Sequence, residues 1–296
     1  MRILNFGSLN LDYVYAVDHI VVPGETISSS RLDVFCGGKG LNQSVALARA
    51  GAPVWHAGAV GPDGGPLLAM CRENGVNAAH IREVEERSGN AIIQVAADGQ
   101  NSIVLFPGAN RKNEKGFVDA VLDSFDAGDV LVLQNEINLV PYIIDRAAEK
   151  GMFTVLNPSP FDAGVTACDL TKISLFMVNE VEGEQITGAV EPGAILDGIG
   201  RKYPHVKTVL TLGGDGAVYQ DGGERIWQKA FRAEVVDTTA AGDTFAGYYL
   251  AGFIEGKKPA DALRMASFAA SLAVSRAGAT SSIPLRSEVD ASLPPA

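Results

Sequence analysis

Asp243 stands where a strand-like run enters a turn of small residues and a helix leaves that turn. The predicted helix covers residues 241–254, so the backbone N–H groups of Ala241, Gly242 and Asp243 fall in its first turn. No helical carbonyl accepts a hydrogen bond from those N–H groups. Together with the helix dipole, the free N–H groups favour anionic oxygens such as those of phosphate. The Asp243 carboxylate beside them can accept the proton of an attacking hydroxyl. The pattern therefore predicts phosphoryl transfer with Asp243 as the general base.

An alternative explanation of such residues requires no chemistry. Aspartate is a favoured helix N-cap, so Asp243 is also compatible with a purely capping role. Asn179 and Glu182 present the same choice, because they lie three residues apart at the predicted start of another helix. That spacing places them on one face, but it also forms a capping box.

The elements that must position these residues alternate between strand and helix through most of the chain. Apolar runs predict strands at 3–7, 54–60, 130–133, 153–156, 175–178 and 208–212. Helical patterns are predicted at 39–50, 67–73, 140–150, 180–186, 194–202, 241–254 and 259–276. Such alternation predicts a largely parallel sheet covered by helices on both faces, with ligands at the carboxyl ends of its strands.

Two segments, 13–35 and 88–107, interrupt the alternation with β-like runs and polar turns. In the second segment, two strand-like runs flank Asp98-Gly99, which predicts a hairpin. We interpret the two segments as a small β lid, and an edge extension without function is the alternative. The main domain is then formed by the remaining residues, 1–12, 36–87 and 108–296.

Composition limits the classes of function. Lys and Arg number 24 against 35 Asp and Glu, a net charge of −11, which argues against a nucleic-acid binder. The three cysteines, Cys36, Cys71 and Cys168, show no metal-binding spacing and are expected to be free thiols of a cytoplasmic protein. No run approaches the roughly 18 apolar residues of a membrane span, so no membrane partner is expected. The N-terminus is predicted to be a strand and not a signal peptide.

Two distant motifs resemble the signatures of the PfkB family of sugar kinases, and in particular its ribokinases. They are FCGGKGLNQ at residues 35–43 and DTTAAGDTF at residues 237–245, and the resemblance extends from residues 7–12 to residues 278–284. It implies a ribokinase-like three-layer α/β/α sandwich with a largely parallel central sheet and a small β-sheet lid. It also implies an ATP-dependent kinase for the terminal primary hydroxyl of a small sugar, with D-ribose the first choice.

The resemblance also implies a role for individual residues. Those expected to bind the sugar are Asn10, Asp12, Gly38, Lys39, Asn42, Glu136 and Asp243. Those expected to bind ATP are Asn179, Thr211, Gly213, Gly214, Gly216, Ala241, Gly242 and Ser267. Glu182 is expected to hold Mg²⁺ through water, and the residues expected to supply oxygens to K⁺ are Asp237, Thr239, Arg276, Gly278 and Ser282. Ser267 departs from the family, which has a histidine near the adenine, and pairing of lids implies a homodimer.

Several alternatives remain open at this point. Within the family, the substrate could be fructose, deoxyribose, a nucleoside or a phosphosugar; Arg111 is a candidate cation for the last, or a solvated loop residue. A non-catalytic sugar-binding protein on the same fold would be expected to lack the base or the anion site. The run around Lys39 is not a P-loop, and no GxGxxG follows the first strand, so a dinucleotide-dependent oxidoreductase has little support.

Overall fold

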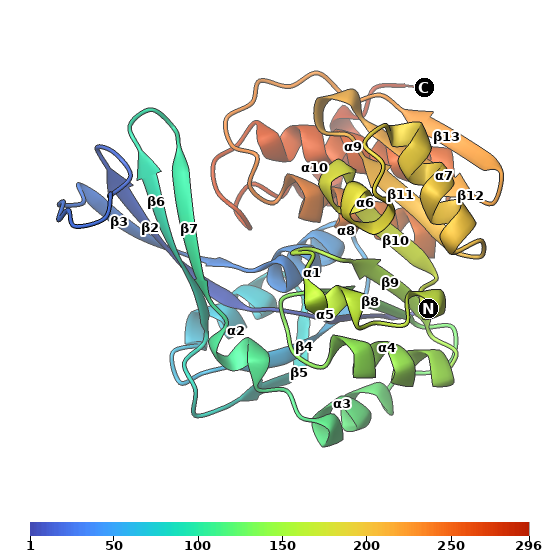
Figure 1. Cartoon of the computed structure of the whole chain (residues 1–296), viewed down its shortest axis with the longest axis horizontal. Helices are drawn as coiled ribbons and strands as arrows, with labels where there is room; N and C mark the ends of the chain where they lie inside the picture. Colours follow the sequence, from blue (N-terminus) through green and yellow to red (C-terminus); the bar gives the residue numbers. More distant parts are fainter. Residues whose placement is uncertain (296) are drawn as a thin grey trace.

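A nine-stranded sheet forms the centre of the larger part of the molecule (Figure 1). The structure is a computed structural model that describes residues 1–295. The strand order is β13-β12-β11-β10-β9-β8-β1-β4-β5, and the strands from β11 to β5 run parallel. Their bounds are β1 Ile3–Phe6, β4 Val54–Val60, β5 Asn77–Glu83, β8 Val130–Gln134, β9 Phe153–Asn157, β10 Leu175–Asn179, β11 Lys207–Thr211, β12 Ala217–Asp221 and β13 Glu224–Gln228.

Alternate side chains of the central strands enter two apolar cores, one on each face of the sheet. On β1, Ile3 belongs to the first core and Leu4 to the second, as the two-residue period of a strand requires. The first core is covered by α1 (Lys39–Arg49), α2 (Gly65–Glu73), α8 (Ala241–Ile254), α9 (Pro259–Val274) and α10 (Arg286–Ser292). The second is covered by α3 (Lys115–Leu122), α4 (Val140–Glu149), α5 (Ala163–Thr166), α6 (Glu180–Thr187) and α7 (Pro192–Lys202). The predicted three-layer α/β/α sandwich is confirmed.

The sequence-based assignment omitted three strands of this sheet: the edge strands β5 and β13, and β12, which pairs with β13. Edge strands bury less of their surface, so β5 (NAAHIRE) lacks the continuous apolar run that identifies a buried parallel strand. The β12–β13 pair is antiparallel and is joined at Gly222-Gly223, a turn signal that the prediction did not use.

A second, four-stranded sheet projects from the main body at the left of Figure 1. Its order is β3-β2-β6-β7, with bounds β2 Asn10–Val17, β3 Arg31–Gly37, β6 Gly89–Ala96 and β7 Asn101–Phe106. The predicted hairpin at Asp98-Gly99 is confirmed, because β6 and β7 are antiparallel and Gly99 adopts φ 86°. Since β2 starts at Asn10, the strand that enters the projecting sheet also carries two of the predicted sugar ligands, Asn10 and Asp12.

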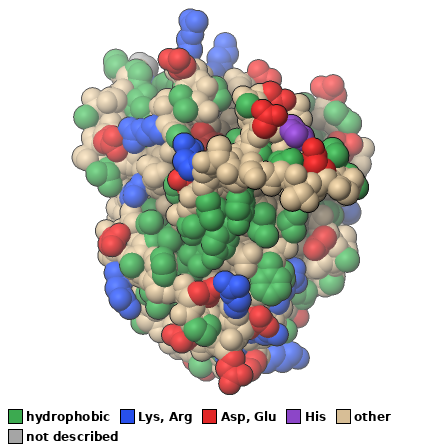
Figure 2. Space-filling model, turned by 90° about the vertical axis from the view of Figure 1, so that its left-hand side faces the viewer, with side chains coloured by type: hydrophobic (Ala, Val, Ile, Leu, Met, Phe, Trp, Pro, Cys, Tyr) green, Lys and Arg blue, Asp and Glu red, His purple; other side chains and the backbone are tan. Residues whose placement is uncertain are grey.

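One face of the projecting sheet is apolar and open to solvent. Figure 2 shows hydrophobic side chains gathered on the side of the molecule that this sheet occupies. Strand register places Val34, Ile92 and Val104 in one row across the sheet, and each is about half exposed or more. Asp12 and Phe35 occupy the neighbouring row, so their side chains leave from the opposite face.

Two further expectations concern the whole chain. Cys36, Cys71 and Cys168 are free cysteines, as predicted. Among residues 1–295, no helix combines the length and the apolar character that crossing a bilayer requires.

Candidate active site

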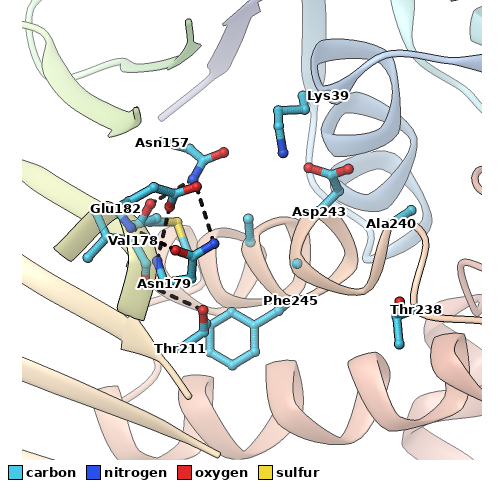
Figure 3. A pocket seen from close by; sticks show the side chains of 13 residues that line it. Lys39, Asn157, Val178, Asn179, Glu182, Thr211, Thr238, Ala240, Asp243 and Phe245 are labelled. Atoms are coloured by element: carbon cyan, nitrogen blue, oxygen red, sulfur yellow. Dashed lines mark hydrogen bonds between the residues drawn. The ribbon is translucent and has the colours of Figure 1, made fainter. Parts of the chain in front are cut away.

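A cavity of about 260 Å³ lies at the carboxyl ends of three parallel strands, facing the N-termini of α1 and α8 (Figure 3). The last residues of β9, β10 and β11, which are Asn157, Asn179 and Thr211, form one side of it. The full lining consists of Lys39, Asn157, Met177, Val178, Asn179, Glu182, Thr211, Thr238, Ala240, Gly242, Asp243, Phe245 and Ala246. The ligand position expected for a parallel sheet therefore coincides with the helix start that carries Asp243.

Asp243 is not the cap of its helix. The N-cap of α8 is Ala240, in the left-handed conformation with φ 58°, and no side chain caps that helix end. Asp243 lies in the first turn, buried except for 7% of its surface, and its carboxylate accepts from two side-chain amides of α1. Asn42 Nδ2 donates to Oδ2 at 3.1 Å and Gln43 Nε2 donates to Oδ1 at 2.9 Å. The capping alternative is therefore wrong.

In the part of the chain that the structure describes, two of the three backbone N–H groups predicted to be free at the start of α8 are free, and that of Ala241 is not. Ala241 N donates to Thr238 O at 3.2 Å, because the left-handed Ala240 closes a tight turn before the helix. The helical ladder starts with Thr244 N, which donates to Ala240 O at 2.8 Å. Within residues 1–295, the N–H groups of Gly242 and Asp243 have no acceptor. Two donors at the positive end of α8 thus remain available to an anion.

Glu136 fixes the start of α1. Its Oε2 accepts from Lys39 N at 3.0 Å and also from the Ser8 hydroxyl. Gly38, immediately before Lys39, has φ 91°, a conformation that glycine adopts without strain. Burial raises the pKa of Glu136, and the contacts from Ser8 and Lys39 only partly offset that effect. Glu136 thus contacts the turn formed by Gly38 and Lys39, and their role in sugar binding stays a prediction.

The Lys39 side chain points into the cavity (Figure 3). Burial alone would lower the pKa of the Lys39 ammonium, but the carboxylates of Asp243, Glu136 and Glu182 outweigh burial and raise it. The side chain therefore stays positively charged at neutral pH. It supplies the cavity with a fixed cation in a strongly acidic protein.

Asn10 and Asp12 lie together near the base of β2. Asn110 Nδ2 donates to Asn10 Oδ1 at 2.7 Å, so the oxygen of the Asn10 amide is held within the protein. Gly37 makes room for Asp12, since a Cβ at that position would lie 2.0 Å from Asp12 Oδ2. Burial, and secondarily the charge of Glu136, raises the pKa of Asp12 to about 7. The Asp12 carboxyl group is therefore poised to change its charge near neutral pH.

Asn179 and Glu182 form the capping box that was the alternative to a functional role. Asn179 Oδ1 accepts from Glu182 N at 2.9 Å, and Glu182 Oε2 accepts from Asn179 N at 3.0 Å. Both side chains also line the cavity. The capping box thus holds a carboxylate at the cavity wall, so the two explanations do not exclude each other.

The residues predicted to contact ATP are only partly brought together. Thr211, Asn179 and Gly242 line the cavity, and Gly213 and Gly214 are exposed just beyond Thr211. Gly216 has a structural requirement of its own, because a Cβ there would lie 2.0 Å from Gln228 O.

Ser267 is a separate case among these residues. It is buried on α9 and lies outside the cavity lining. Its hydroxyl has no hydrogen-bond partner within the described chain. The structure therefore leaves a hydrogen-bonding group at this position that the protein itself does not use.

The segments predicted to hold K⁺ are joined by Asp237. Its Oδ1 accepts from Thr239 N and its Oδ2 from Gly278 N, both at 2.9 Å. The Arg276 side chain instead pairs with Glu288, so only backbone oxygen of Arg276 is available to an ion. Ser282 is fully buried and its hydroxyl donates to Ala279 O at 2.8 Å. Asp237 thus connects the turn before α8 with the segment that contains Gly278.

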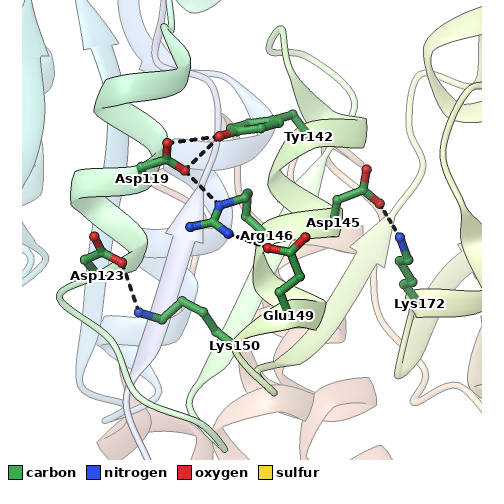
Figure 4. A network of polar contacts seen from close by, with 8 residues as sticks. All are labelled: Asp119, Asp123, Tyr142, Asp145, Arg146, Glu149, Lys150 and Lys172. Atoms are coloured by element: carbon green, nitrogen blue, oxygen red, sulfur yellow. Dashed lines mark hydrogen bonds and ion pairs between the residues drawn. The ribbon is translucent and has the colours of Figure 1, made fainter.

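A second polar network lies on the outer surface of α3 and α4 (Figure 4). Asp119 accepts from Tyr142 and from Arg146 Nε, each at 2.9 Å, and Lys150 pairs with Asp123 at 3.3 Å. Its charged groups have their partners, and none of these residues lines the cavity. The network is consistent with an exposed tie between two helices, a type of contact that adds little stability.

Sequence reasoning missed several polar residues of the site, among them Thr238, Asn157, Gln43 and Asn110. Asn157 ends β9 as Asn179 ends β10, so a search for polar residues at strand ends would have found it. Gln43 follows Asn42 directly, and Asn110 lies in the turn Gly108–Arg111, but their roles depend on contacts with residues about 100 or more positions away. No local pattern reports such contacts.

Comparison with known proteins gives one consistent result. Residues 2–286 match the model of a family described as pfkB family carbohydrate kinase. The chain is 36% identical over 292 residues to a ribokinase of Haemophilus influenzae, covering 95% of each chain. A ribokinase of Cryptococcus neoformans solved in complex with ADP superposes with a TM-score of 0.86 at 34% identity, covering 98% of this chain and 99% of that one. An Arabidopsis thaliana ribokinase complexed with ribose and ATP gives 0.86 at 29% identity, covering 98% and 97%. The family match includes every residue that lines the cavity.

Proposed function

The chain belongs to the pfkB family of carbohydrate kinases, and from that premise we propose that it phosphorylates the terminal primary hydroxyl of D-ribose with ATP, giving ribose 5-phosphate. The observation that carries the proposal is the Asp243 carboxylate, which lines the cavity beside the unpaired amides of its own helix. The similarity to ribokinases over nearly the full length, one of them solved with ribose and ATP, supports ribose as the sugar.

In this reaction Asp243 accepts the proton of the sugar hydroxyl while the hydroxyl oxygen attacks the γ-phosphorus in line. A new O–P bond forms, the bond to the β-phosphate oxygen breaks, and ADP leaves. The N–H groups of Gly242 and Asp243 stabilise the charge on the γ-phosphoryl oxygens, and the Lys39 ammonium adds a positive charge nearby. Asn10 and Asp12 hold the sugar hydroxyls at the far side of the site.

Two metal ions fit the residues present. Mg²⁺ bound to the phosphates would neutralise part of their charge, and Glu182, which lines the cavity, would hold that ion through water. A K⁺ ion would be held by Asp237 and by backbone oxygens of the segments that Asp237 joins. There it would order the turn before α8 without contacting the sugar.

A coupled assay for ADP tests the function directly. The panel contains ribose, deoxyribose, fructose, fructose 6-phosphate and nucleosides, each with and without K⁺. We expect sugar-dependent ADP formation with the highest kcat/KM for ribose, and stimulation by K⁺. Preference for any other member of the panel would overturn ribose as the substrate. Absence of sugar-dependent ADP would instead support a non-catalytic sugar-binding protein.

Sugar binding is expected to depend on pH through Asp12. Its pKa is raised to about 7, so the carboxylate that accepts two sugar hydroxyls is lost as the pH falls through about 7. We therefore expect kcat/KM for ribose to rise with pH across this range, since kcat/KM reports groups of the free enzyme. The Asp12→Asn variant cannot titrate at this position and should lose that dependence. An unchanged pH profile in Asp12→Asn would show that another group is responsible.

We also propose that the sheet of β2, β3, β6 and β7 acts as a lid over the sugar and joins two subunits. Closure would exclude water, which limits hydrolysis of ATP without sugar. The row formed by Val34, Ile92 and Val104 is an exposed apolar surface beside the unpaired edges of β3 and β7. A second copy of the chain would cover both the apolar row and those edges.

A charge in this apolar row is expected to separate the subunits. Val104 is 64% exposed on β7, so Val104→Glu costs little within one subunit but places a carboxylate in the proposed interface. We expect a homodimer for the wild type and a monomer for Val104→Glu by light scattering coupled to size exclusion. Val190→Glu is the matched control, because Val190 is 66% exposed and lies outside the projecting sheet. A wild-type monomer, or an intact Val104→Glu dimer, would contradict the proposal.

A further inference from the structure

We infer that Gln43 is a positioning residue that holds the Asp243 carboxylate in its reactive orientation; this inference rests on the proposed role of Asp243 as the base. Gln43 is 2% exposed and lies on α1, next to Asn42, which serves the other carboxylate oxygen. Gln43 Nε2 donates to Asp243 Oδ1 at 2.9 Å, and the same nitrogen lies 3.5 Å from Asn157 Oδ1. With one amide on each oxygen, the carboxylate cannot rotate without losing a buried hydrogen bond.

The orientation of the Gln43 amide is itself determined by its neighbours. Gln134 Nε2 donates to Gln43 Oε1 at 2.6 Å and to Asn5 Oδ1 at 3.0 Å. A rotated Gln43 amide would turn its oxygen toward the Asp243 carboxylate and its NH₂ toward the NH₂ of Gln134. Both new contacts would be repulsive, so the neighbouring side chains permit only one orientation of the Gln43 amide.

The chain of hydrogen bonds continues to a fixed backbone carbonyl. Asn5 Nδ2 donates to Ser44 Oγ at 2.8 Å, Ser44 Oγ lies 2.8 Å from His56 Nδ1, and His56 Nε2 lies 3.2 Å from Gly7 O. Burial lowers the pKa of His56 to about 4, so the imidazole is neutral at pH 7. Because Gly7 O can only accept, His56 Nε2 carries the hydrogen and Nδ1 accepts from Ser44.

Every donor direction in the network therefore follows from that one carbonyl. The network extends from β1 and β4 through α1 to the first turn of α8. Four of its side chains are fully buried: Asn5, Ser44, His56 and Gln134. A hydrogen-bond network that served only to stabilise the core could end on any buried acceptor. This one ends on the proposed base, which a packing role does not require.

The test replaces Gln43 by methionine, which keeps the length of the side chain and removes the donor. We expect kcat for ribose to fall about 10- to 100-fold, the loss of one hydrogen bond to a charged group, with KM for both substrates unchanged. Gln220→Met is the matched control. Gln220 lies on β12, is 3% exposed and donates to Leu196 O at 2.9 Å. The same substitution there should lower Tm while kcat stays as in the wild type.

A double variant separates positioning from any other effect. If Gln43 acts through Asp243, then Gln43→Met together with Asp243→Ala should be no slower than Asp243→Ala alone. A further loss of rate in the double variant would overturn the inference, as would a Gln43→Met enzyme as fast as Gln220→Met.

Three further outcomes of these experiments can be told apart. If Gln43→Met does not fold, Gln134→Met releases the Gln43 amide without touching Asp243; it should lower kcat at constant KM, and an unchanged kcat would contradict positioning. If Asp243→Ala itself keeps the wild-type rate, the proposed base has failed, and the inference fails with it. A slow Asp243→Ala with a fast Gln43→Met removes the inference alone.

Discussion

The Asp243→Ala variant is expected to lower kcat by roughly 10²- to 10⁴-fold, the range for removing a general base. The carboxylate is the acidic group in the first turn of α8, and it lines the cavity beside the free amides of that turn. Without it, the sugar hydroxyl must lose its proton to water. The sugar should still bind, because Asn10, Asp12 and Glu136 are untouched, so KM for ribose should change little.

Initial rates of ADP formation at saturating ATP measure this effect. Asp261→Ala provides a matched control, because Asp261 occupies the same position in the first turn of α9 but is exposed and outside the cavity. It should retain wild-type kcat. If Asp243→Ala kept more than about half of the wild-type rate, Asp243 would have no place in the mechanism.

The Asp12→Ala variant is expected to weaken sugar binding by ~1–3 kcal/mol, which corresponds to an increase of roughly 5- to 150-fold in KM or Kd. Loss of the carboxyl group leaves buried sugar hydroxyls without an acceptor. The phosphoryl-transfer groups on α8 are not altered, so kcat at saturating sugar should fall far less than in Asp243→Ala. The separation of the two effects would assign Asp12 to binding and Asp243 to chemistry.

Calorimetric titration with ribose, together with KM from the ADP assay, checks this expectation. Asp18→Ala is the control, because Asp18 directly follows β2 and its side chain is 94% exposed. It should bind ribose as the wild type does. An Asp12→Ala enzyme with unchanged KM for every sugar tested would show that the sugar lies elsewhere.

The parallel sheet could be predicted because its buried strands are continuous apolar runs separated by helical patterns. Two of the omitted strands, β5 and β13, lie at the edges of the sheet, where partial burial leaves a mixed pattern such as that of β5, and β12 is the strand next to β13. Their absence from the prediction does not change the fold class. It changes only the number of strands in the sheet and the path of the chain after Thr211.

Prediction of the site depended on two local motifs, and these did bring Lys39, Asn42 and Asp243 together. The error at Ala241 has a specific cause. Whether its amide is free depends on the φ of Ala240, and a small-residue turn is compatible with several values. Gln43 was missed for another reason, since its partner Asp243 is 200 residues away in the chain.

Strand β2 has a consequence for altering the enzyme. The residues proposed to select the sugar, Asn10 and Asp12, stand on the same strand that forms the projecting sheet, whereas the proposed base stands on α8. Part of the proposed recognition surface is thus carried by a strand remote from α8, while Lys39, Asn42 and Glu136 lie outside that strand. A chimera that receives the first 37 residues and the β6–β7 hairpin of a relative with another sugar preference should shift toward that preference while keeping its own rate of phosphate transfer.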